Sequence, residues 1–535
     1  MEKYEIIIIG AGASGLAASW YLVNSGINVA CFEQGDFLKK EELIELDLGG
    51  ELQRFNSLSF DPNIRNSNCD YFIDSAQSPI HIANFNGVGG STVLFSGQYP
   101  RLKPSDFLVK TNDGLAADWP INYKDLLPFY EMNDQITGVS GLSGDRKDPY
   151  FKSLMPPVPF GEMGRKLIKG FETLNWHWWP AYSAINTIPY NKRPPDDHSR
   201  PSNLGGDIRG GKGSTNNTYF PQAIDKGLIL KTNCKVTKLI KNSKRNSIEK
   251  VIYIDENGEE CVAKGDIIIL AASGIGTPRI LLSSIHDSNQ RGIANSSNLV
   301  GRNLMLHPLG YIEGHFREDL RSNSGPQGCC ILSQEFYDSD IKRGFHRGYT
   351  FQIIRGPLPI EAALNFTSRK LVSFGKGFFK EFNSIYNHTA HMTVITEDLP
   401  EFDNRILISN KNFDKFNNPG VEIHYKLSEN TKKMLIHGLN NGRKLMRAAN
   451  AYKSFVMGPV RNTGWHTLGT CCMGKNPDSS VVNEFGKAHD LENLFILDGS
   501  VFPTSGGVNP ASTIQAMALY ISDKIITRYI SLIKK

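Results

Sequence analysis

The chain of 535 residues carries 59 Lys and Arg against 54 Asp and Glu, a formal net charge of +5 at pH 7. This length exceeds what one compact core usually holds, so two or more domains are expected. The near balance of charge, with no arginine-rich stripe or long lysine run, argues against a nucleic-acid partner. Eight cysteines without a C-x-x-C pattern are typical of buried thiols in a reducing compartment.

The N-terminal segment predicts a dinucleotide site. Residues 5–9 form a β-branched strand, a G-x-G-x-x-G turn follows, and the helical pattern LAASWYLVNSG comes next. A second strand, INVACFE, ends in an acid. Glycines let the backbone approach a pyrophosphate, a helix N-terminus supplies oriented N–H groups, and a carboxylate accepts ribose hydroxyls. The residues predicted to bind FAD or NAD are Gly10, Gly12, Ala13, Ser14, Gly15 and Glu33.

Two later segments favour FAD over NAD. Residues 84–101, NFNGVGGSTVLFSGQYPR, form a second glycine-rich segment that is too irregular for another Rossmann turn. The end of the chain predicts a strand, an acid–glycine turn, a loop and a last helix. That helix is expected to begin with Asn509 as N-cap and Pro510 at its first position. A chain that begins with an adenosine site and ends with another cofactor-facing segment is typical of flavoproteins.

The sequence predicts no membrane span. The apolar run of residues 6–9 leads directly into glycines, unlike a signal peptide, and no run of about eighteen apolar residues follows. We therefore expect a cytoplasmic protein. The basic end of the tail, YISDKIITRYISLIKK, leaves a peripheral contact with an anionic surface open, beside the simpler interpretation of a last helix with a solvated basic end.

Several segments, in order along the chain, resemble blocks of the glucose-methanol-choline (GMC) family of FAD-dependent oxidoreductases. These blocks are IIIIGAGASGLAAS, GVGGSTVLFSGQYPR, DWPINYKDLLPFYEM, GSTNNTYFPQAIDKGLILKTNCKV, ILAASGIGTPRILLSS, NLVGRNLMLHP and the segment from Trp465 onward. The resemblance implies an α/β fold, α+β overall, with a Rossmann-like FAD-binding domain and a substrate domain built on an antiparallel sheet. The implied FAD-binding domain comprises residues 1–45, 83–110, 205–305 and 456–535. The implied substrate-binding domain comprises residues 46–82, 111–204 and 306–455.

The resemblance also implies how FAD is held. The additional FAD-binding positions are Gly89, Gly90, Ser91, Thr92, Leu94, Phe95, Ser96, Val236, Asp498, Gly499, Asn509 and Pro510. Some family members attach FAD covalently through a histidine at the position of Leu94, so non-covalent FAD is implied here. An aromatic residue at Phe95 resembles the branch that contains pyranose oxidase and the fructose and gluconate dehydrogenases. That branch favours a sugar, a polyol or another hydroxylated metabolite as substrate.

Alcohol oxidation by a flavin removes a hydroxyl proton and passes a hydride to flavin N5, so a base is needed beside the hydroxyl. Histidine suits this role because its unperturbed pKa lies near working pH. By resemblance, the base is His466 in an H-x-x-G-T block, and its companion is Asn509, 43 positions later. A direct substrate contact by Asn509 is favoured over capping alone. The N-terminus of the last helix would stabilise negative charge on the reduced flavin.

The predicted activity is the FAD-dependent oxidation of an alcohol to an aldehyde or ketone, with electrons passed to a quinone, a cytochrome or a small acceptor. An oxygen-using alcohol oxidase is the alternative, and a hydroxynitrile lyase-like or a non-catalytic flavin-binding protein are further ones. No metal site is expected, because His466, Cys471 and Cys472 lack additional ligands at short regular spacing. His307, in LMLHP, is interpreted as structural.

Three segments leave two interpretations open. Residues 191–218, rich in Pro, Gly and charge, are either a mobile cover of the active site or a plain connector. The NWHWWP segment, residues 175–180, is either an aromatic core cluster, which we favour, or a platform for sugar stacking. Glu397 either makes a structural contact or faces a cationic or hydroxylated substrate.

Overall fold

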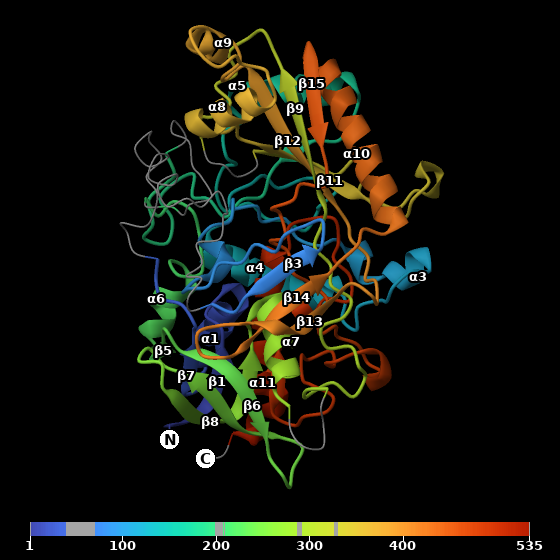
Figure 1. Cartoon of the computed structure of the whole chain (residues 1–535). Helices are drawn as coiled ribbons and strands as arrows, with labels where there is room; N and C mark the ends of the chain where they lie inside the picture. Colours follow the sequence, from blue (N-terminus) through green and yellow to red (C-terminus); the bar gives the residue numbers. More distant parts are fainter. Residues whose placement is uncertain are drawn as a thin grey trace.

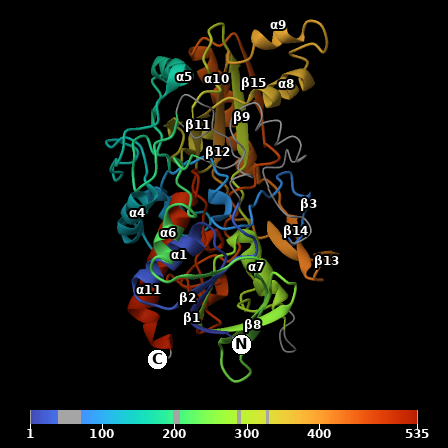
Figure 2. The same cartoon turned by 90° about the vertical axis from the view of Figure 1, so that its left-hand side faces the viewer.

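Two sheets at opposite ends of the molecule organise the fold (Figure 1). The structure, a computed structural model of the chain, describes residues 2–38, 70–197, 207, 209–285, 291–325 and 330–533. Both chain termini lie at the end formed by the first sheet, and two perpendicular views place the second sheet at the other end (Figures 1 and 2).

The first sheet is mixed and has the order β5-β2-β1-β8-β7-β6, with β16 beside β8. Its strands are β1 (Glu2–Ile9), β2 (Val29–Phe32), β5 (Ile229–Lys231), β6 (Lys235–Lys241), β7 (Ile248–Ile254), β8 (Glu260–Leu270) and β16 (Leu494–Ile496). β5, β2, β1, β8 and β16 are parallel, whereas β6 and β7 form an antiparallel edge. Residues 6–9 are all buried, because a parallel strand is covered by other elements on both faces.

Helices from both ends of the chain pack beside this sheet. α1 (Ala13–Asn24) contacts α6 (Tyr219–Ile224) and α11 (Ala511–Tyr529), and α4 (Tyr123–Thr137) packs on α11. α7 (Ser273–Ser283) follows β8 and lies against β6. The fold therefore brings the N-terminal and C-terminal segments together, as the sequence predicted for a cofactor site built from both.

The second sheet is antiparallel throughout and has the order β15-β9-β12-β11-β10-β4. Its strands are β4 (Trp179–Pro180), β9 (Leu309–His315), β10 (Ile331–Ser333), β11 (Tyr349–Ile354), β12 (Thr389–Thr396) and β15 (Lys453–Met457). One face packs on α10 (Glu429–Ala448) and α5 (Gly161–Thr173) through an apolar cluster that includes Ile312, Met392 and Met446. The other face carries polar side chains and belongs to the candidate site.

Smaller elements join the two sheets. β3 (Ile73–Gln77), β13 (Arg405–Phe413) and β14 (Pro419–His424) form a three-stranded sheet in the order β13-β14-β3. The other helices and helical turns named below are η2 (Gly90–Thr92), η3 (Pro104–Phe107), α3 (Val109–Asp113), α8 (Pro359–Ser368), α9 (Phe378–Asn383) and η6 (Gly499–Val501). None of the helices in the described parts of the chain is long and apolar enough to cross a membrane.

The fold class agrees with the sequence prediction: an α/β, Rossmann-like part is combined with a part built on an antiparallel sheet. The strands of the first sheet come from the segments predicted for FAD binding, and the exact domain boundaries stay a prediction. Residues 39–69, and residues 198–206 and 208 of the predicted 191–218 loop, lie outside the described residues. The roles predicted for these segments therefore stay predictions as well.

The NWHWWP segment packs as part of the core beside the second sheet. The Trp176 ring lies 5.0 Å from the Phe336 ring, edge to face, and Trp178 packs similarly on Phe160 at 6.0 Å. The Trp179 indole N–H donates to the Leu142 carbonyl at 2.8 Å. These contacts agree with the favoured interpretation of an aromatic core cluster.

A buried arginine connects the second sheet with η3 and α3. Arg347, just before β11, donates from Nη2 to Asp106 Oδ1 of η3 at 2.5 Å and from Nε to Glu397 Oε1 at 2.9 Å. Its Nη1 lies 3.2 Å from Asp113 Oδ2 of α3. Burial raises the pKa of Glu397 to about 7, although Arg347 acts in the opposite direction. Of the two interpretations of Glu397, the structural contact is therefore the one present.

Arg347→Met should destabilise the protein by about 3–5 kcal/mol, because the substitution leaves buried carboxylates without their cation. The measurement is the guanidinium unfolding of the holoenzyme, compared with that of the wild-type protein. Arg165→Met removes an exposed pair with Glu162 on α5 and serves as the control that should change the midpoint little. Equal midpoints for Arg347→Met and wild type would show that Arg347 does not stabilise the packing of these elements.

Candidate active site

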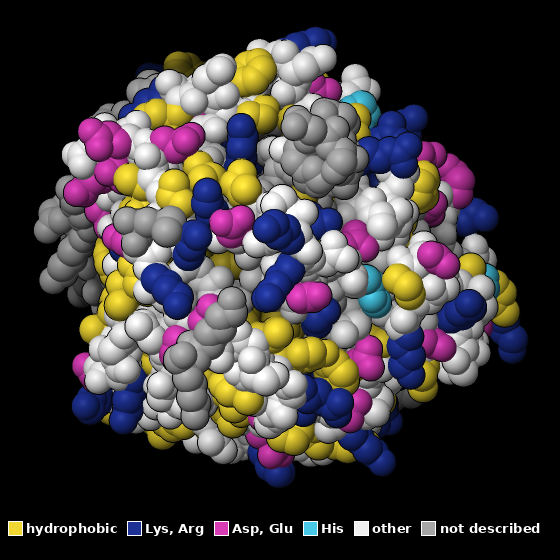
Figure 3. Space-filling model, turned by 90° about the horizontal axis from the view of Figure 1, so that it is seen from below, with side chains coloured by type: hydrophobic (Ala, Val, Ile, Leu, Met, Phe, Trp, Pro, Cys, Tyr) yellow, Lys and Arg dark blue, Asp and Glu magenta, His cyan; other side chains and the backbone are white. Residues whose placement is uncertain are grey.

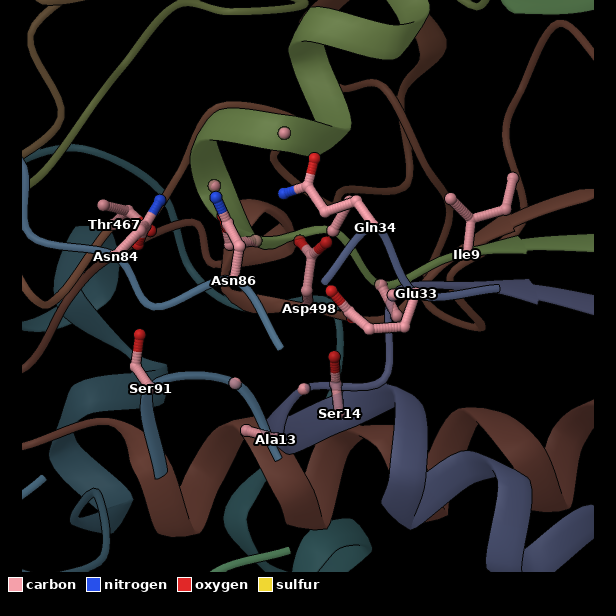
Figure 4. A pocket seen from close by; sticks show the side chains of 18 of the residues that line it. Ile9, Ala13, Ser14, Glu33, Gln34, Asn84, Asn86, Ser91, Thr467 and Asp498 are labelled. Atoms are coloured by element: carbon pink, nitrogen blue, oxygen red, sulfur yellow. The ribbon is translucent and has the colours of Figure 1, made fainter. Parts of the chain in front are cut away.

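A cavity of about 1000 Å³, its solvent-open part included, lies where the carboxyl ends of the parallel strands meet (Figure 4). This edge is the usual ligand site of a Rossmann-like sheet, because helix N-termini and loops converge there. Figure 4 shows Ser14 at the start of α1, Glu33 after β2 and Asp498 around the same space. The predicted residues that line the cavity are Gly10, Gly12, Ala13, Ser14, Glu33, Gly90, Ser91, Val236, Asp498 and Gly499.

The backbone forms a cradle between the two glycine-rich segments. A Cβ on Gly90 would lie 2.8 Å from the Gly12 Cα, so the two turns approach as closely as glycines allow. The Gly89 N–H donates to the Ala11 carbonyl at 2.8 Å and holds them together. Gly12 is the N-cap of α1, and no side chain caps this helix. The first N–H groups of α1 are thus suited to an anionic group such as a pyrophosphate.

Glu33 is held at the adenosine end by the backbone. Its Oε2 accepts from the Ala11 N–H at 2.8 Å, and its Oε1 accepts from the Gly35 N–H at 3.0 Å. Burial raises the pKa of Glu33, and these two N–H donors act against that rise. A carboxylate has about four acceptor positions, so the fixed group retains acceptor capacity for ribose hydroxyls.

The other predicted FAD-binding residues support the cavity without lining it. Thr92 Oγ1 donates to the Gly89 carbonyl at 2.6 Å and accepts from the Thr215 N–H at 3.0 Å. The Phe95 carbonyl accepts from Lys212 Nζ at 2.8 Å, and burial lowers the pKa of this lysine to about 8. The predicted residues absent from the cavity wall are Gly15, Gly89, Thr92, Leu94, Phe95, Ser96, Asn509 and Pro510.

One side of the cavity was missed by sequence reasoning. The turn between β8 and α7, residues 271–274, lines it, together with Asn84, Asn86 and Thr467. A signal was present, because LAASGIG is a second strand–turn–helix, and β8 pairs in parallel with β1. A Cβ on Gly274 would lie 2.3 Å from the Thr467 carbonyl oxygen. This close packing brings the segment around His466 to the cavity, whose wall includes Trp465 and Thr467.

His466 faces a second imidazole. His466 Nδ1 lies 3.0 Å from His307 Nδ1, and His307 Nε2 lies 2.6 Å from the Gly506 carbonyl oxygen. Burial lowers the pKa of both rings, that of His307 to about 4 and that of His466 well below 6.5, with His307 adding to the second shift. Both imidazoles are therefore neutral near pH 7. Sequence reasoning gave His307 only a structural role and missed its contact with the predicted catalytic histidine.

The contacts of the two neutral rings determine their tautomers. A carbonyl oxygen only accepts, so His307 Nε2 carries a proton and donates to Gly506. His307 Nδ1 is then the acceptor, and His466 Nδ1–H donates to it. The remaining nitrogen of His466, Nε2, is unprotonated. His307 has a φ of +49°, which non-glycine residues rarely adopt and which is typical of residues held in place at functional sites.

Asn509 completes this hydrogen-bond chain and does not cap the last helix. Its Oδ1 accepts from Gln352 Nε2, so its Nδ2 faces His466 Nε2 at 3.5 Å. α11 begins at Ala511 with Pro510 as N-cap and without a side-chain cap, so the predicted N-cap role of Asn509 is wrong by one position. The side chain uses its hydrogen bonds for Gln352 and His466 instead. The 3.5 Å contact is weak, which leaves the Nε2 lone pair available.

Gln352 belongs to a polar row across the second sheet. In the strand register, Gln352 of β11 lies opposite Thr393 of β12, which lies opposite Tyr311 of β9. Residues in register share a sheet face, so Thr393 and Tyr311 lie on the same face as Gln352, the residue that contacts Asn509. Thr393 and Tyr311 are only partly buried. The row places hydroxyl and amide groups along the sheet next to Asn509, which Gln352 contacts.

Cys471 is buried in the core and Cys472 is partly exposed, and both are free thiols. Burial raises the pKa of each. In the part of the chain that the structure describes, no group of three or more His, Cys, Asp or Glu side chains is arranged to hold a metal ion.

The sequence and the fold are both similar to those of known proteins. Family models described as GMC oxidoreductase match residues 138–309 and 400–518, and one described as NAD(P)-binding Rossmann-like domain matches residues 8–38. The chain is 33% identical to 2-methyl-1,2-propanediol dehydrogenase of Mycolicibacterium austroafricanum over 99% of this chain and 96% of that protein. It is 27% identical to the fructose dehydrogenase large subunit of Gluconobacter japonicus, over 98% and 97% of the two chains. Pyridoxine 4-oxidase from Mesorbium loti has a similar fold, with a TM-score of 0.69 at 16% identity over 97% and 99% of the chains.

The cavity combines three features: the N-terminus of α1 without a side-chain cap, the carboxylate of Glu33 held by backbone N–H groups, and the neutral imidazole of His466 nearby. This arrangement is typical of a dinucleotide-dependent oxidoreductase. The chain belongs to the GMC oxidoreductase family. FAD is therefore its cofactor, and the predictions of family, fold class and FAD are confirmed. The roles of individual residues stay predictions.

Gly12→Ala should weaken FAD binding without unfolding the chain. The added Cβ would meet only the Gly90 Cα, at 3.8 Å, yet it lies on the cavity wall where a pyrophosphate must approach. We expect the Kd for FAD to rise at least about tenfold, equivalent to about 1.4 kcal/mol, with little change in the melting temperature of the apoprotein.

Gly15→Ala is the matched comparison, because its Cβ would lie 1.8 Å from the Gly10 carbonyl oxygen. It should lower the melting temperature of the apoprotein as well as its FAD content. Titration with FAD and thermal unfolding of the apoprotein separate the two effects. Unchanged FAD affinity in Gly12→Ala would contradict the prediction that the pyrophosphate binds in the backbone cradle between the two glycine-rich segments.

His307→Leu should slow substrate-dependent flavin reduction by about ten- to hundredfold, because His466 loses the acceptor that fixes its tautomer. His307→Asn places a carbonyl oxygen near the position of Nδ1 and should restore part of the rate. The measurement is anaerobic stopped-flow reduction of the flavin, with FAD content and melting temperature determined for each variant. A purely structural His307 predicts equal rates for the Leu and Asn variants at equal FAD content.

Proposed function

We propose that this chain is an FAD-dependent dehydrogenase that oxidises an alcohol group of a small polyhydroxy compound, such as a diol or polyol, to an aldehyde or ketone. The observation that carries the proposal is the unprotonated Nε2 of His466, next to Asn509 and adjacent to the FAD cavity. Both residues are partly exposed, so a substrate oxygen has access to them.

The proton chemistry follows from the orientation of these side chains. His466 Nε2 takes the hydroxyl proton of the substrate, and its lowered pKa means that the ring is ready to accept a proton throughout the neutral range. Asn509 Nδ2 donates to the substrate oxygen as negative charge develops on it. Its orientation is fixed, because Oδ1 is already bonded to Gln352. FAD, when bound, supplies the hydride acceptor.

The polar row supports a hydroxylated substrate. Gln352, Thr393 and Tyr311 extend from the proposed base across the sheet, and a second hydroxyl of a diol or polyol would find donors and acceptors along this line. An aliphatic alcohol has no second hydroxyl to bond with these groups, so we expect it to bind more weakly than a diol or polyol. The relatives named for a propanediol and for fructose point to the same class of substrate.

Electron transfer to a quinone, a cytochrome or another small acceptor is favoured over the use of oxygen. The 33% and 27% identical relatives are named dehydrogenases, while a 28% identical one, which also covers 98% of this chain, is named 6'''-hydroxyparomomycin C oxidase. Non-covalent FAD is supported by Leu94, whose apolar side chain offers no group for a covalent bond and is buried beside Phe85 and Val93. Faster reoxidation of the reduced enzyme by air than by any dye acceptor would instead favour the oxidase alternative.

His466→Ala should lower the rate constant of flavin reduction by roughly 10² to 10⁴ without loss of FAD, because it removes the proton acceptor. The experiment is anaerobic mixing of the holoenzyme with a panel of diols, polyols, sugars and simple aliphatic alcohols. In the wild type, reduction should be independent of pH from about 6.5 upward and should decline only at lower pH, where the imidazole becomes protonated.

His489→Ala is a matched control, since His489 lies outside the cavity wall and bonds Ser480 Oγ at 2.9 Å. It should leave the reduction rate unchanged. A wild-type flavin that no alcohol reduces would favour the lyase-like or non-catalytic alternatives, and a His466→Ala variant with the wild-type rate would exclude His466 as the base.

A further inference from the structure

A helical hairpin projects from the end of the molecule that carries the second sheet (Figures 1 and 2). It consists of α8, a short loop and α9, and it has a small core of its own, built from Ala362, Phe366, Val372 and Phe382. Phe378 stacks on Phe382 at 5.7 Å with nearly parallel rings. The hairpin is thus an ordered unit whose inner aromatic side chains pack against one another.

Two other phenylalanines of the hairpin face solvent. Phe374, in the loop, is 94% exposed, and Phe379, on α9, is 77% exposed. They are the most exposed large apolar side chains of the described residues, where the next is Ile341 at 64%. The loop is fixed, because Glu381 of α9 accepts from the Ser373 N–H at 2.5 Å. Scattered apolar residues are normal on a surface, but two almost fully exposed rings on one projection indicate a contact surface.

Three lysines lie within four residues of these two rings in the sequence. Lys370, Lys376 and Lys380 are exposed, and within the described residues none of their ammonium groups is paired with a carboxylate. Arg369 differs: its Nη1 lies 3.0 Å from both carboxylate oxygens of Glu313, and it anchors the hairpin on β9. The tip therefore combines two exposed aromatic rings with three exposed cations that are unpaired within the described part of the chain.

We propose that this tip, Phe374, Phe379 and the three lysines, docks the protein on an anionic lipid surface. The two rings enter the interfacial region, and the lysine ammonium groups lie among the lipid phosphates, since exposed apolar side chains and basic residues together drive peripheral binding. A protein partner is disfavoured, because lysine is depleted in protein interfaces. At the opposite end of the molecule, the face in Figure 3 shows basic and acidic side chains interspersed, which gives no comparable attraction to an anionic surface.

The test is co-sedimentation of the holoenzyme with vesicles of phosphatidylcholine alone or of equal parts phosphatidylcholine and phosphatidylglycerol. The wild type should bind the anionic vesicles more tightly, and added salt should weaken this binding. Phe374→Ser with Phe379→Ser should lower the partition coefficient at least about tenfold on anionic vesicles. Replacing Lys370, Lys376 and Lys380 with Gln should lower it by roughly fivefold for each lysine on anionic vesicles and leave the weak binding to neutral vesicles unchanged.

Two exposed apolar residues away from the tip provide matched controls. Phe413→Ser on β13 and Ile436→Ser on α10, at 49% and 59% exposure, should bind vesicles as the wild type does. Failure of the wild type to bind anionic vesicles would overturn the proposal, as would wild-type binding by the double Phe variant. A change of oligomeric state in the double Phe variant, without any vesicle binding, would identify a protein contact instead.

The vesicle assay is independent of the proposed catalytic function. Flavin reduction by the alcohol panel in solution should be unaffected by the tip substitutions, because none of these residues lines the cavity or contacts His466. Loss of vesicle binding with intact reduction, and the reverse, are therefore distinguishable results.

Discussion

The arrangement of the site depends on one buried guanidinium. Arg347 holds Asp106, and Asp106 Oδ2 accepts from the Tyr337 hydroxyl at 2.6 Å, which in turn accepts from the Gly507 N–H at 3.2 Å. The loop before α11 is thus positioned from the second sheet. The same loop carries the Gly506 carbonyl, which sets the tautomer of His307 and, through it, that of His466. A charge network in the core therefore determines which nitrogen is available for proton transfer.

Burial disfavours the charged form at both ends of the site, and the two ends differ in the hydrogen-bond partners that they supply. Near the start of α1, both carboxylate oxygens of Glu33 accept hydrogen bonds, one from the Ala11 N–H and one from the Gly35 N–H. At the other end, His466 has only another imidazole and an amide as partners, so burial keeps it neutral. The proposed acceptor for ribose hydroxyls is thus supplied with backbone donors, whereas the proposed acceptor for a proton is kept without charged partners.

Local sequence patterns predicted the parts of the site that depend on short-range geometry. The turn from β1 to α1 and Glu33 follow from glycine spacing and strand length, and His466 and Asn509 were found together through the family resemblance. Gln352 and the register of Thr393 with Tyr311 depend on strand pairing between distant segments, which spacing does not encode. Only the N-cap position predicted for Asn509 was wrong, because an Asn-Pro pair favours a cap, yet a long-range bond to Gln352 takes the same oxygen. His307 was underestimated for the same reason: its partner is 159 positions away.

The hairpin that carries the proposed lipid-facing tip is bonded to the same sheet face as the polar row of the candidate site. Arg369 of the hairpin is bonded to Glu313, whose row in the register, Ile354, His391 and Glu313, is the next one along from Gln352, Thr393 and Tyr311. Rows of this kind on one face are about 7 Å apart, two residues along each strand. Tyr311 links them, since its hydroxyl lies 2.5 Å from His391 Nδ1 and 3.1 Å from Glu313 Oε2. The hairpin that carries the proposed docking tip is therefore connected, through Glu313 and Tyr311, to the polar row that begins at Gln352, the partner of Asn509.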